Sequence, residues 1–334
     1  WVARLGGDQF AIIQRECSDL RQVRELVVRL LHALKQVIII DNYPFRLEVG
    51  IGIAFFPMDS KLTQELLSRA EQALFHSRKT HVPYVIYDNS LLNETARRKH
   101  LASDMIMALE HNALELYYQP IVNLESGRCE AVEALLRWRD AQLGSVPPDR
   151  FIPVAEATGL ILPLGTWVLE AACRQAAQWA QQGMALRIAV NLSALQLRQA
   201  SLVAVLQELL QRYAVGHGLL ELEITESEAM ADPMLARRLL VQLQALGVGV
   251  SLDDFGTGHS SLTYLKQLPI SRIKLDRSFI QPILHNPQDA TLVRAVIALA
   301  HTLGLEVVAE GVEEEAQVRL LETQGCDIFQ GWFF

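Results

Sequence analysis

The stretch GVGVSLDDFGTGHSS (247–261) places two aspartates, Asp253 and Asp254, at the end of an apolar run and just before a Gly-x-Gly turn. A short apolar run bounded by glycine is typical of a buried strand. In barrels built from alternating strands and helices, the carboxyl ends of the strands form the active site. The stretch therefore predicts a strand that delivers two carboxylates to a site. Because neighbours in a continuing strand point to opposite faces, we expect the strand to end at Asp253 and the chain to turn at Gly256 and Gly258, so that Asp254 faces the same site.

The same alternation of strand and helix recurs from about residue 113 onward. The strand candidates are LELYYQPIV (114–122), CEAVEALLRW (129–138), LRIAVNLS (186–193), LLELEITES (219–227), GVGVSLDDF (247–255), ISRIKLD (270–276), LEVVAEGV (305–312) and DIFQGWFF (327–334). Eight strands with mostly helical crossovers predict an α/β fold, a TIM-like (β/α)8 barrel. Only a short turn with a glycine separates the first two candidates, so we expect a hairpin and an irregular start of the barrel.

The amino-terminal part has a different, α+β pattern. Its expected elements are a hairpin in VARLGGDQFAII (2–13), a helix over 20–36, a strand in FRLEVGIGIAFF (45–56) and a helix over 62–79. Residues 91–111 are helix formers without Pro or Gly and predict a connecting helix. We therefore predict three parts: a small domain over 1–90, the connecting helix over 91–111, and the barrel over 112–334.

Composition excludes several classes of protein. The net charge of −8 and the lack of a polybasic tract argue against binding of DNA or RNA polymers. The four cysteines lie far apart and form no C-x-x-C pair, so neither a zinc site nor a disulfide framework is expected. The most apolar long stretch, 292–312, is interrupted by charged residues and does not predict a membrane span.

The two ends of the sequence indicate a fragment. It opens on Trp1 without a starting methionine or a signal-peptide pattern. The widely spaced cysteines suggest free thiols in a reducing cytoplasm, and we expect any membrane anchor of the parent protein to lie in an unseen amino-terminal region. It stops at Phe334, shortly after the last strand candidate, so we expect the barrel to be truncated at its carboxyl end and this fragment to be poorly soluble.

Polar residues collect at the predicted carboxyl ends of the strands. They are Glu133, Asn191, Glu223, Glu226, Asp253, Asp254, Lys274, Asp276, Glu310, Glu313 and Gln330. Converging carboxylates are costly to desolvate unless cations compensate them. An all-oxygen donor set without His or Cys favours Mg²⁺ or Mn²⁺ over zinc, and adjacent aspartates suggest two ions bridged by one carboxylate. The pattern predicts a two-metal site suited to phosphodiester chemistry.

Seven motifs, in order, resemble those of the EAL-domain phosphodiesterases, which hydrolyse cyclic di-GMP to the linear dinucleotide pGpG. The motifs are EALLRW (133–138), NLS (191–193), EITES (223–227), LDDFGTGHSSL (252–262), IKLD (273–276), AEGVE (309–313) and QGWFF (330–334). The resemblance covers about 230 residues and implies cyclic di-GMP as substrate, two Mg²⁺ or Mn²⁺ ions, and a homodimer formed through the EAL domain.

The resemblance also implies a role for individual residues. Metal ligands are Glu133, Asn191, Glu223, Asp253 and Asp254, with Glu310 as a water-mediated ligand or base. Lys274 and Gln330 position the attacking water, and Glu226 steadies the DDFGTG loop. Substrate contacts come from Arg137, Gln119 and Leu135. His259 stands where the family often has tyrosine, and we expect a modest effect at most.

The amino-terminal part resembles the second half of a GGDEF diguanylate cyclase domain, through RLGGDQFAII, GIGIAFFPMD and RAEQALFHSRK. Gln9 replaces the acidic fourth residue of the signature, and Glu71, Phe75 and Arg78 replace usual residues of a later motif. We therefore expect a degenerate domain that is non-catalytic or regulatory.

Two alternatives to an active phosphodiesterase remain open on sequence. One is a catalytically inactive receptor for cyclic di-GMP, which is disfavoured because no predicted metal ligand is lost. The other is a barrel that performs Mg²⁺-assisted proton abstraction with Lys274 as base. The EALLRW and DDFGTG runs argue against it.

Overall fold

The computed structural model describes residues 1–15, 20–34, 38–40, 43–45, 47, 49–80, 82–111, 113–140, 144–256 and 262–334. The chain divides into two compact units, Trp1–Lys99 and His100–Phe334. The expectations for His259 and for Gly258 of the predicted turn lie outside the described residues.

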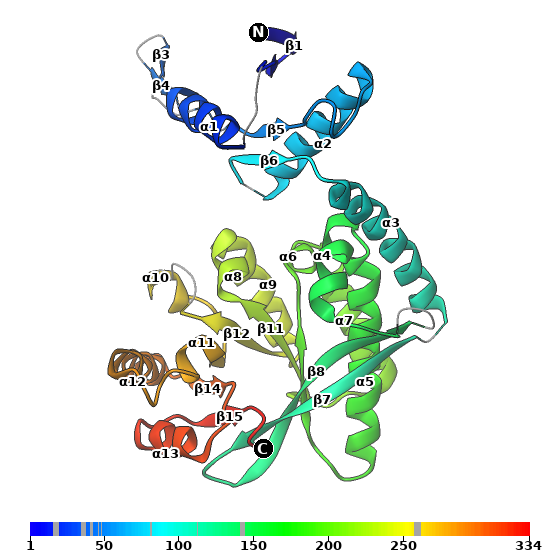
Figure 1. Ribbon diagram of the computed structural model, residues 1–334. Coiled ribbons are helices and arrows are strands. Elements are labelled where there is room, and N and C mark those ends of the chain that lie inside the picture. The colour runs from blue at the N-terminus through cyan, green and yellow to red at the C-terminus, as the bar shows by residue number, and fades with distance from the viewer. Residues whose placement is uncertain are drawn as a thin grey trace. The chain divides into compact units, whose positions relative to one another are not determined.

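Eight strands of the second unit close into a ring, which confirms the predicted barrel (Figure 1). They are β7 (Leu114–Asn123), β8 (Arg128–Asp140), β10 (Arg187–Asn191), β11 (Leu220–Thr225), β12 (Gly249–Phe255), β13 (Arg272–Leu275), β14 (Glu306–Glu310) and β15 (Ile328–Gln330). The order is β10–β11–β12–β13–β14–β15–β7–β8, and pairing of β8 with β10 closes the ring. Each strand lies within or close to a stretch predicted from the sequence.

The start of the barrel is irregular, as predicted. β7 and β8 form a hairpin, and β7 runs antiparallel to both of its neighbours, β8 and β15. The other neighbours in the ring pair in parallel. A short strand, β9 (Gly144–Val146), pairs with the far end of β8 outside the ring. The carboxyl ends of the parallel strands consequently meet at one rim.

Helices surround the barrel and connect its parallel strands (Figure 1). They are α4 (Pro148–Thr158), α5 (Ile161–Gln181), α6 (Ala194–Leu197), α7 (Leu202–Tyr213), α8 (Glu226–Ala231), α9 (Pro233–Ala245), α10 (Leu262–Leu265), α11 (Arg277–Ile280), α12 (Pro287–Thr302) and α13 (Glu315–Thr323). Ser193 and Thr225 begin α6 and α8 through capping boxes. Each cap stands two residues after a polar side chain, Asn191 or Glu223, so the strand ends just beyond that side chain.

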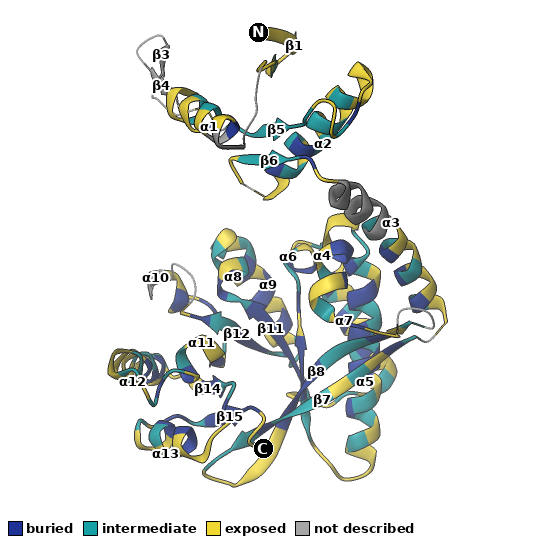
Figure 2. Cartoon of the chain, in the orientation of Figure 1, coloured by how far each residue is buried: buried dark blue, intermediate teal, exposed yellow. Residues whose placement is uncertain are grey.

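The main core lies between the strands and the helices around them. Figure 2 shows buried residues along the strands and on the helix sides that face them. A separate apolar layer, of Ile121, Ala131, Ala189, Val308 and Ile328, fills the inside of the barrel. This layer closes the barrel below the rim, so the rim is the place where a ligand can enter.

The helix expected over 91–111 is present as α3 (Asn89–Glu110). Its last turns belong to the second unit, because Leu101, Met105 and Ala108 are buried together with residues of β8 and α4. The proposed division into 1–90, 91–111 and 112–334 stays a prediction.

The first unit contains the predicted hairpin and helices. Its elements are β1 (Val2–Gly6), β2 (Gln9–Ile12), α1 (Leu20–Leu34), β3 (Ile38–Ile40), β4 (Tyr43–Phe45), β5 (Ile51–Ile53), α2 (Thr63–Thr80) and β6 (Tyr84–Ile86). β1 and β2 pair antiparallel, and β5 pairs in parallel with β6. Gly52 allows α2 to approach β5, because a Cβ there would lie 2.1 Å from the carbonyl oxygen of Ala70. None of the described helices has the length and apolar character needed to cross a membrane.

Candidate functional site

Every barrel strand contributes at least one polar side chain to the site at the rim. These are Gln119 (β7), Glu133 (β8), Asn191 (β10), Glu223 (β11), Asp253 (β12), Lys274 (β13), Glu310 (β14) and Gln330 (β15). The register places several of them side by side, since Gln119 pairs with Glu133, Asn191 with Glu223, and Glu310 with Gln330. The structure therefore brings together residues that lie up to 211 positions apart in the chain.

Lys274 lies at the centre of this group. Its Nζ is 2.6 Å from Glu310 Oε1, 3.0 Å from Glu223 Oε1, and 3.6 Å from both Glu133 Oε2 and Asp253 Oδ1. Only 2% of the Lys274 side chain is exposed. Burial alone lowers the pKa of a lysine, but these four carboxylates outweigh burial and raise the pKa of Lys274 well above its ordinary value. The side chain is therefore a fixed positive charge.

Glu133 is held as a carboxylate by donors on three strands. Asn191 Nδ2 donates to its Oε1 at 2.6 Å, and Gln330 Nε2 donates to its Oε2 at 2.5 Å. Gln330 Nε2 also donates to Gln119 Oε1 at 3.3 Å. Burial tends to raise the pKa of Glu133, but Lys274 and the amide donors outweigh burial and keep that pKa below its ordinary value.

Three further carboxylates, those of Glu223, Glu310 and Asp254, are less easily ionised. Burial raises the pKa of Glu223 well above its ordinary value against the pull of Lys274. Burial also raises the pKa of Glu310 to about 7. Asp254 has a raised pKa through burial and through the neighbouring charge of Asp253. One ammonium thus compensates the surrounding carboxylates only in part, and the site retains an attraction for further positive charge.

The paired aspartates are arranged by a bulge in β12. The expected end of the strand at Asp253 is wrong. β12 continues to Phe255, and its register with β13 shifts between Leu252 and Phe255. Asp254 itself takes the left-handed conformation with φ 53° and donates its N–H to Asp253 Oδ1 at 2.9 Å. A bulge re-aims a side chain without ending the strand, which explains the difference.

Glu226 lies beside the end of this bulge. Its Oε2 accepts a hydrogen bond from the N–H of Gly256 at 2.9 Å, and the side chain is buried. Gly256 has φ 98°, and a Cβ there would lie 2.9 Å from the ring of Phe279. The first residue of α8 thus binds the backbone of Gly256 directly after β12, and the expected role of Glu226 in steadying the DDFGTG loop stays a prediction.

Two of the expected substrate contacts lie farther out along β8. Leu135 and Arg137 follow Glu133 at steps of two residues, so they share its face of the strand. Arg137 Nη1 donates to the carbonyl oxygen of Leu136 at 3.0 Å, and its guanidinium lies over the ring of Tyr117. Among the described residues, Arg137 makes no recorded ion pair with the carboxylates around Lys274.

The donor set is compatible with hard divalent cations. All of the side chains that could bind a metal offer carboxylate or amide oxygens, which Mg²⁺ and Mn²⁺ prefer. Glu223 Oε2 is buried and has no hydrogen-bond partner in the part of the chain that the structure describes. Such an oxygen is costly unless a cation or water approaches it. No three acidic, His or Cys side chains of the described residues form a ready-made metal cluster, and Lys274 lies between the carboxylates instead.

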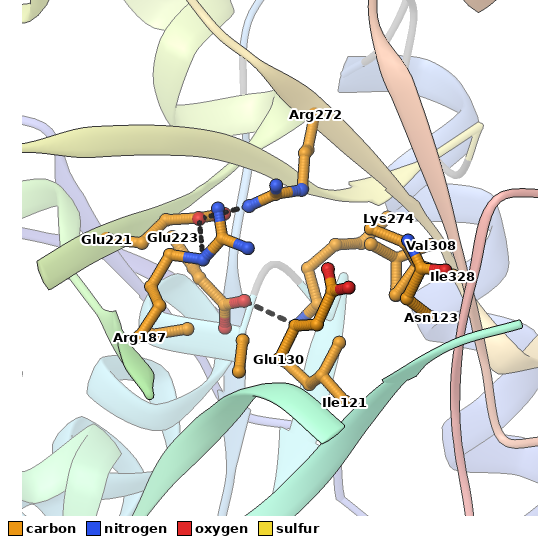
Figure 3. A pocket seen from close by; sticks show the side chains of 12 residues that line it. Ile121, Asn123, Glu130, Arg187, Glu221, Glu223, Arg272, Lys274, Val308 and Ile328 are labelled. Carbon is orange, nitrogen blue, oxygen red and sulfur yellow. Dashed lines mark hydrogen bonds and ion pairs between the residues drawn. The ribbon is translucent and has the colours of Figure 1, made fainter. Parts of the chain in front are cut away.

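A second charged group lies beneath the site, inside the barrel (Figure 3). Glu221 Oε2 is 2.5 Å from Arg272 Nη1 and 3.2 Å from Arg187 Nε, and Arg272 Nη2 is 2.6 Å from Glu306 Oε2. We call these four residues the barrel floor. Sequence reasoning missed them, although Glu221 and Arg272 each precede a rim residue by two positions, the spacing that places them on the same strand face.

The sequence places Asp276 among the candidate site residues, but in the structure its side chain caps a helix. Its Oδ1 accepts from the N–H of Ser278 at 3.1 Å and caps α11. A polar residue at a strand end can therefore cap the next helix, and the sequence alone does not separate the two uses.

Comparison with known proteins identifies the family of both units. The model of the EAL domain matches residues 102–334, and the model described as "Diguanylate cyclase, GGDEF domain" matches residues 1–82. The chain is 43% identical over 335 residues to the bifunctional diguanylate cyclase/cyclic di-GMP phosphodiesterase MucR of Pseudomonas aeruginosa, covering 99% of this chain and 48% of MucR. It is 38% identical over 340 residues to the cyclic di-GMP phosphodiesterase NbdA of the same organism, covering 100% of this chain and 43% of NbdA.

Solved structures agree with this assignment. A structure titled "PaMucR Phosphodiesterase, c-di-GMP complex" matches with a TM-score of 0.68 and 49% identity, over 70% of this chain and 95% of that one. The chain spans about half the length of the curated relatives it matches. Because the EAL model matches most of the sequence, the chain belongs to the EAL domain family and has part of a GGDEF domain before it.

Proposed function

We propose that the protein hydrolyses cyclic di-GMP to linear pGpG. The observation that supports this most directly is the buried Lys274 ammonium among Glu133, Glu223, Asp253 and Glu310 at the open rim of the barrel. Relatives named as cyclic di-GMP phosphodiesterases, and a neighbour solved with c-di-GMP, support the choice of substrate.

The side chains of this chain would divide the work as follows. Arg137, four residues beyond Glu133 on β8, offers a planar fork suited to a phosphate. Lys274 donates toward the site and keeps neighbouring carboxylates in place. Gln330 orients Glu133 and is placed to orient the attacking water, while Glu226 holds the segment after β12. Gln119, on the neighbouring strand β7, supports Gln330 by accepting a hydrogen bond from its Nε2.

Divalent metal ions belong to this proposal. Two Mg²⁺ or Mn²⁺ ions, when bound, would activate water and stabilise charge on the phosphodiester. Their ligands would be Glu133, Asn191, Glu223, Asp253 and Asp254, with Glu310 nearby as a water-mediated ligand or base. The oxygen-only donor set and the unpartnered Glu223 Oε2 support this choice.

The remaining expectations concern the whole protein. We propose that the GGDEF part is non-catalytic or regulatory, since Gln9 replaces an acidic residue of its signature. We also propose that the EAL units form a homodimer and that the protein acts in the cytoplasm on a nucleotide second messenger.

Turnover of cyclic di-GMP by the purified chain with Mn²⁺ tests the proposal, with pGpG measured by chromatography. We expect pGpG from the wild type. Glu133→Gln should lower the rate at least about 100-fold, the scale of losing one charge-stabilising group in an active site. Glu208→Gln on the exposed side of α7 is the matched control and should keep full activity.

Two outcomes would contradict the proposal. Binding of cyclic di-GMP without any pGpG would favour the receptor alternative. Full activity of Glu133→Gln would show that the rim carboxylates are not the reaction centre.

A further inference from the structure

The β7–β8 hairpin continues beyond the barrel rim and forms a wall beside the site. Opposite Gln119 and Glu133 at the rim, the next pair outward on the same face is Tyr117 with Leu135. Directly opposite residues of an antiparallel pair share a face, and a two-residue step advances about 7 Å. Tyr117 therefore stands one step outward from the reaction centre, on the face that continues the inside of the barrel.

The other face of the hairpin is occupied by packing. Tyr118 lies 4.9 Å, centroid to centroid, from Trp179 of α5, and Trp138 lies 5.5 Å from Phe151 of α4. These contacts fix the hairpin against helices. The face with Tyr117 is consequently the one left open to a ligand.

Tyr117 is an exposed aromatic ring whose position is fixed by charged neighbours. It is 45% exposed, and the guanidinium carbon of Arg137 lies 5.6 Å from its centroid. Arg139 Nη2 donates to the Tyr117 hydroxyl at 2.5 Å, and Arg139 Nε lies 3.3 Å from Glu115 Oε2. Arg137, Arg139 and, through Arg139, Glu115 thus orient the ring. Because the ring is already oriented, less conformational entropy is lost when a ligand stacks on it.

A cyclic dinucleotide has the shape that such a wall fits. Its base lies one sugar away from its phosphate, a separation comparable to one two-residue step of a strand, about 7 Å. With a phosphate between the rim and Arg137, a base would reach the ring of Tyr117. Aromatic rings are general stacking platforms for bases, and an arginine beside the ring adds to the attraction.

We propose that Tyr117 is the stacking platform for one base of the dinucleotide and that Arg139 is a positioning residue that orients its ring. This rests on the proposed function, because it presumes that a dinucleotide binds at the rim. Tyr117 then contributes to affinity and to the choice of substrate, whereas the reaction itself depends on the rim residues.

Steady-state kinetics of the full chain with cyclic di-GMP and Mn²⁺, together with calorimetric binding in Ca²⁺, tests this role. Tyr117→Ala should raise KM and Kd about 5- to 100-fold, the span reported for loss of one stacked base, with kcat nearly unchanged. Tyr117→Phe keeps the ring but loses the hydroxyl that Arg139 contacts, so it should raise KM much less than Tyr117→Ala and by about as much as Arg139→Ala. Arg139→Ala should give a smaller rise in KM, because the ring remains but is no longer oriented.

Matched controls separate this role from general damage. Met184→Ala removes another exposed apolar side chain, and Arg212→Ala breaks another exposed arginine network, on α7. Both should leave KM and kcat unchanged. An unchanged KM in Tyr117→Ala, with an active wild type, would overturn the stacking platform and leave the hydrolysis proposal intact. Equal effects of Tyr117→Phe and Tyr117→Ala would also overturn it, and a wild type that neither binds nor cleaves the dinucleotide would overturn both proposals.

Discussion

At the scale of single residues, the site contains more carboxylates than positive charges to compensate them. Lys274 faces four carboxylates, and Glu133 among them has amide donors on both oxygens. A buried charge is tolerated when partners compensate it. The raised pKa of Glu223 and of Glu310 shows where compensation is incomplete. This imbalance favours the binding of cations.

Lys274→Met keeps the length of the side chain and removes its charge. We expect hydrolysis of cyclic di-GMP to fall about 10²- to 10³-fold, as for other preorganised donors at a reacting centre. Lys266→Met, on the exposed surface, is the control and should be neutral. Rate measurements at saturating substrate test this, and an activity of Lys274→Met close to wild type would exclude a role of the lysine in the reaction.

The thiols differ sharply in accessibility. Cys173 and Cys326 are buried, and burial raises the pKa of each to about 12, whereas Cys129 is exposed. We expect iodoacetamide at pH 8 to modify Cys129 in the native protein and to reach the two buried thiols only after unfolding, since the thiolate is the reactive form. Peptide-resolved mass spectrometry measures this. Rapid native labelling of Cys173 would contradict the packing of α5 against the barrel.

At the scale of elements, the strands and the hairpin at the start of the barrel could be predicted, but the bulge in β12 could not. Each barrel strand is a short apolar run between breakers, so its presence follows from local sequence. The bulge at Asp254 depends on how β12 pairs with β13, which no local pattern encodes. The barrel floor escaped prediction for a similar reason, because Glu221 and Arg272 meet only when non-adjacent strands close into a ring.

The bulge predicts different effects for two substitutions of Asp254. Asp254→Asn should keep the left-handed conformation, which asparagine tolerates, and lose activity through loss of a metal-binding charge. Asp254→Val should lose activity and also about 1–2 kcal/mol of stability, because a β-branched residue is strained there. Urea unfolding and turnover assays measure both. Equal stability of the two variants would contradict the φ of 53° at this position.

Removal of one charge from the barrel floor should lower the free energy of unfolding of the protein. Glu221→Ala leaves Arg187 and Arg272 without their shared partner inside the barrel, so we expect unfolding to require about 3–5 kcal/mol less free energy. Glu315→Ala removes an exposed partner of Arg319 and should cost less than about 1 kcal/mol. Denaturant unfolding followed by tryptophan fluorescence compares them. Similar midpoints for the two variants would show that the floor contributes little.

At the scale of the whole molecule, the chain consists of two units with very different cores. The clusters of buried apolar residues lie in the second unit, and buried apolar residues of the first, within its described part, are Val23, Val27, Ala73 and Tyr87. A unit with so small a core is weakly stabilised by burial. The second unit should therefore resist proteolysis longer than the first.

The carboxyl-terminal turns of α3 determine where a stable fragment of the second unit has to begin. Leu101 and Met105 are buried against Trp138 and Phe151, so a fragment of residues 100–334 keeps this cluster and a fragment of 112–334 loses it. We expect the longer fragment to hydrolyse cyclic di-GMP and to melt near the main transition of the full chain. The shorter one should lose at least about 4 kcal/mol, since each large core side chain removed costs about 2–5 kcal/mol. Thermal melting and turnover of both fragments provide the measurement, and equal stability would mean that α3 only connects the units.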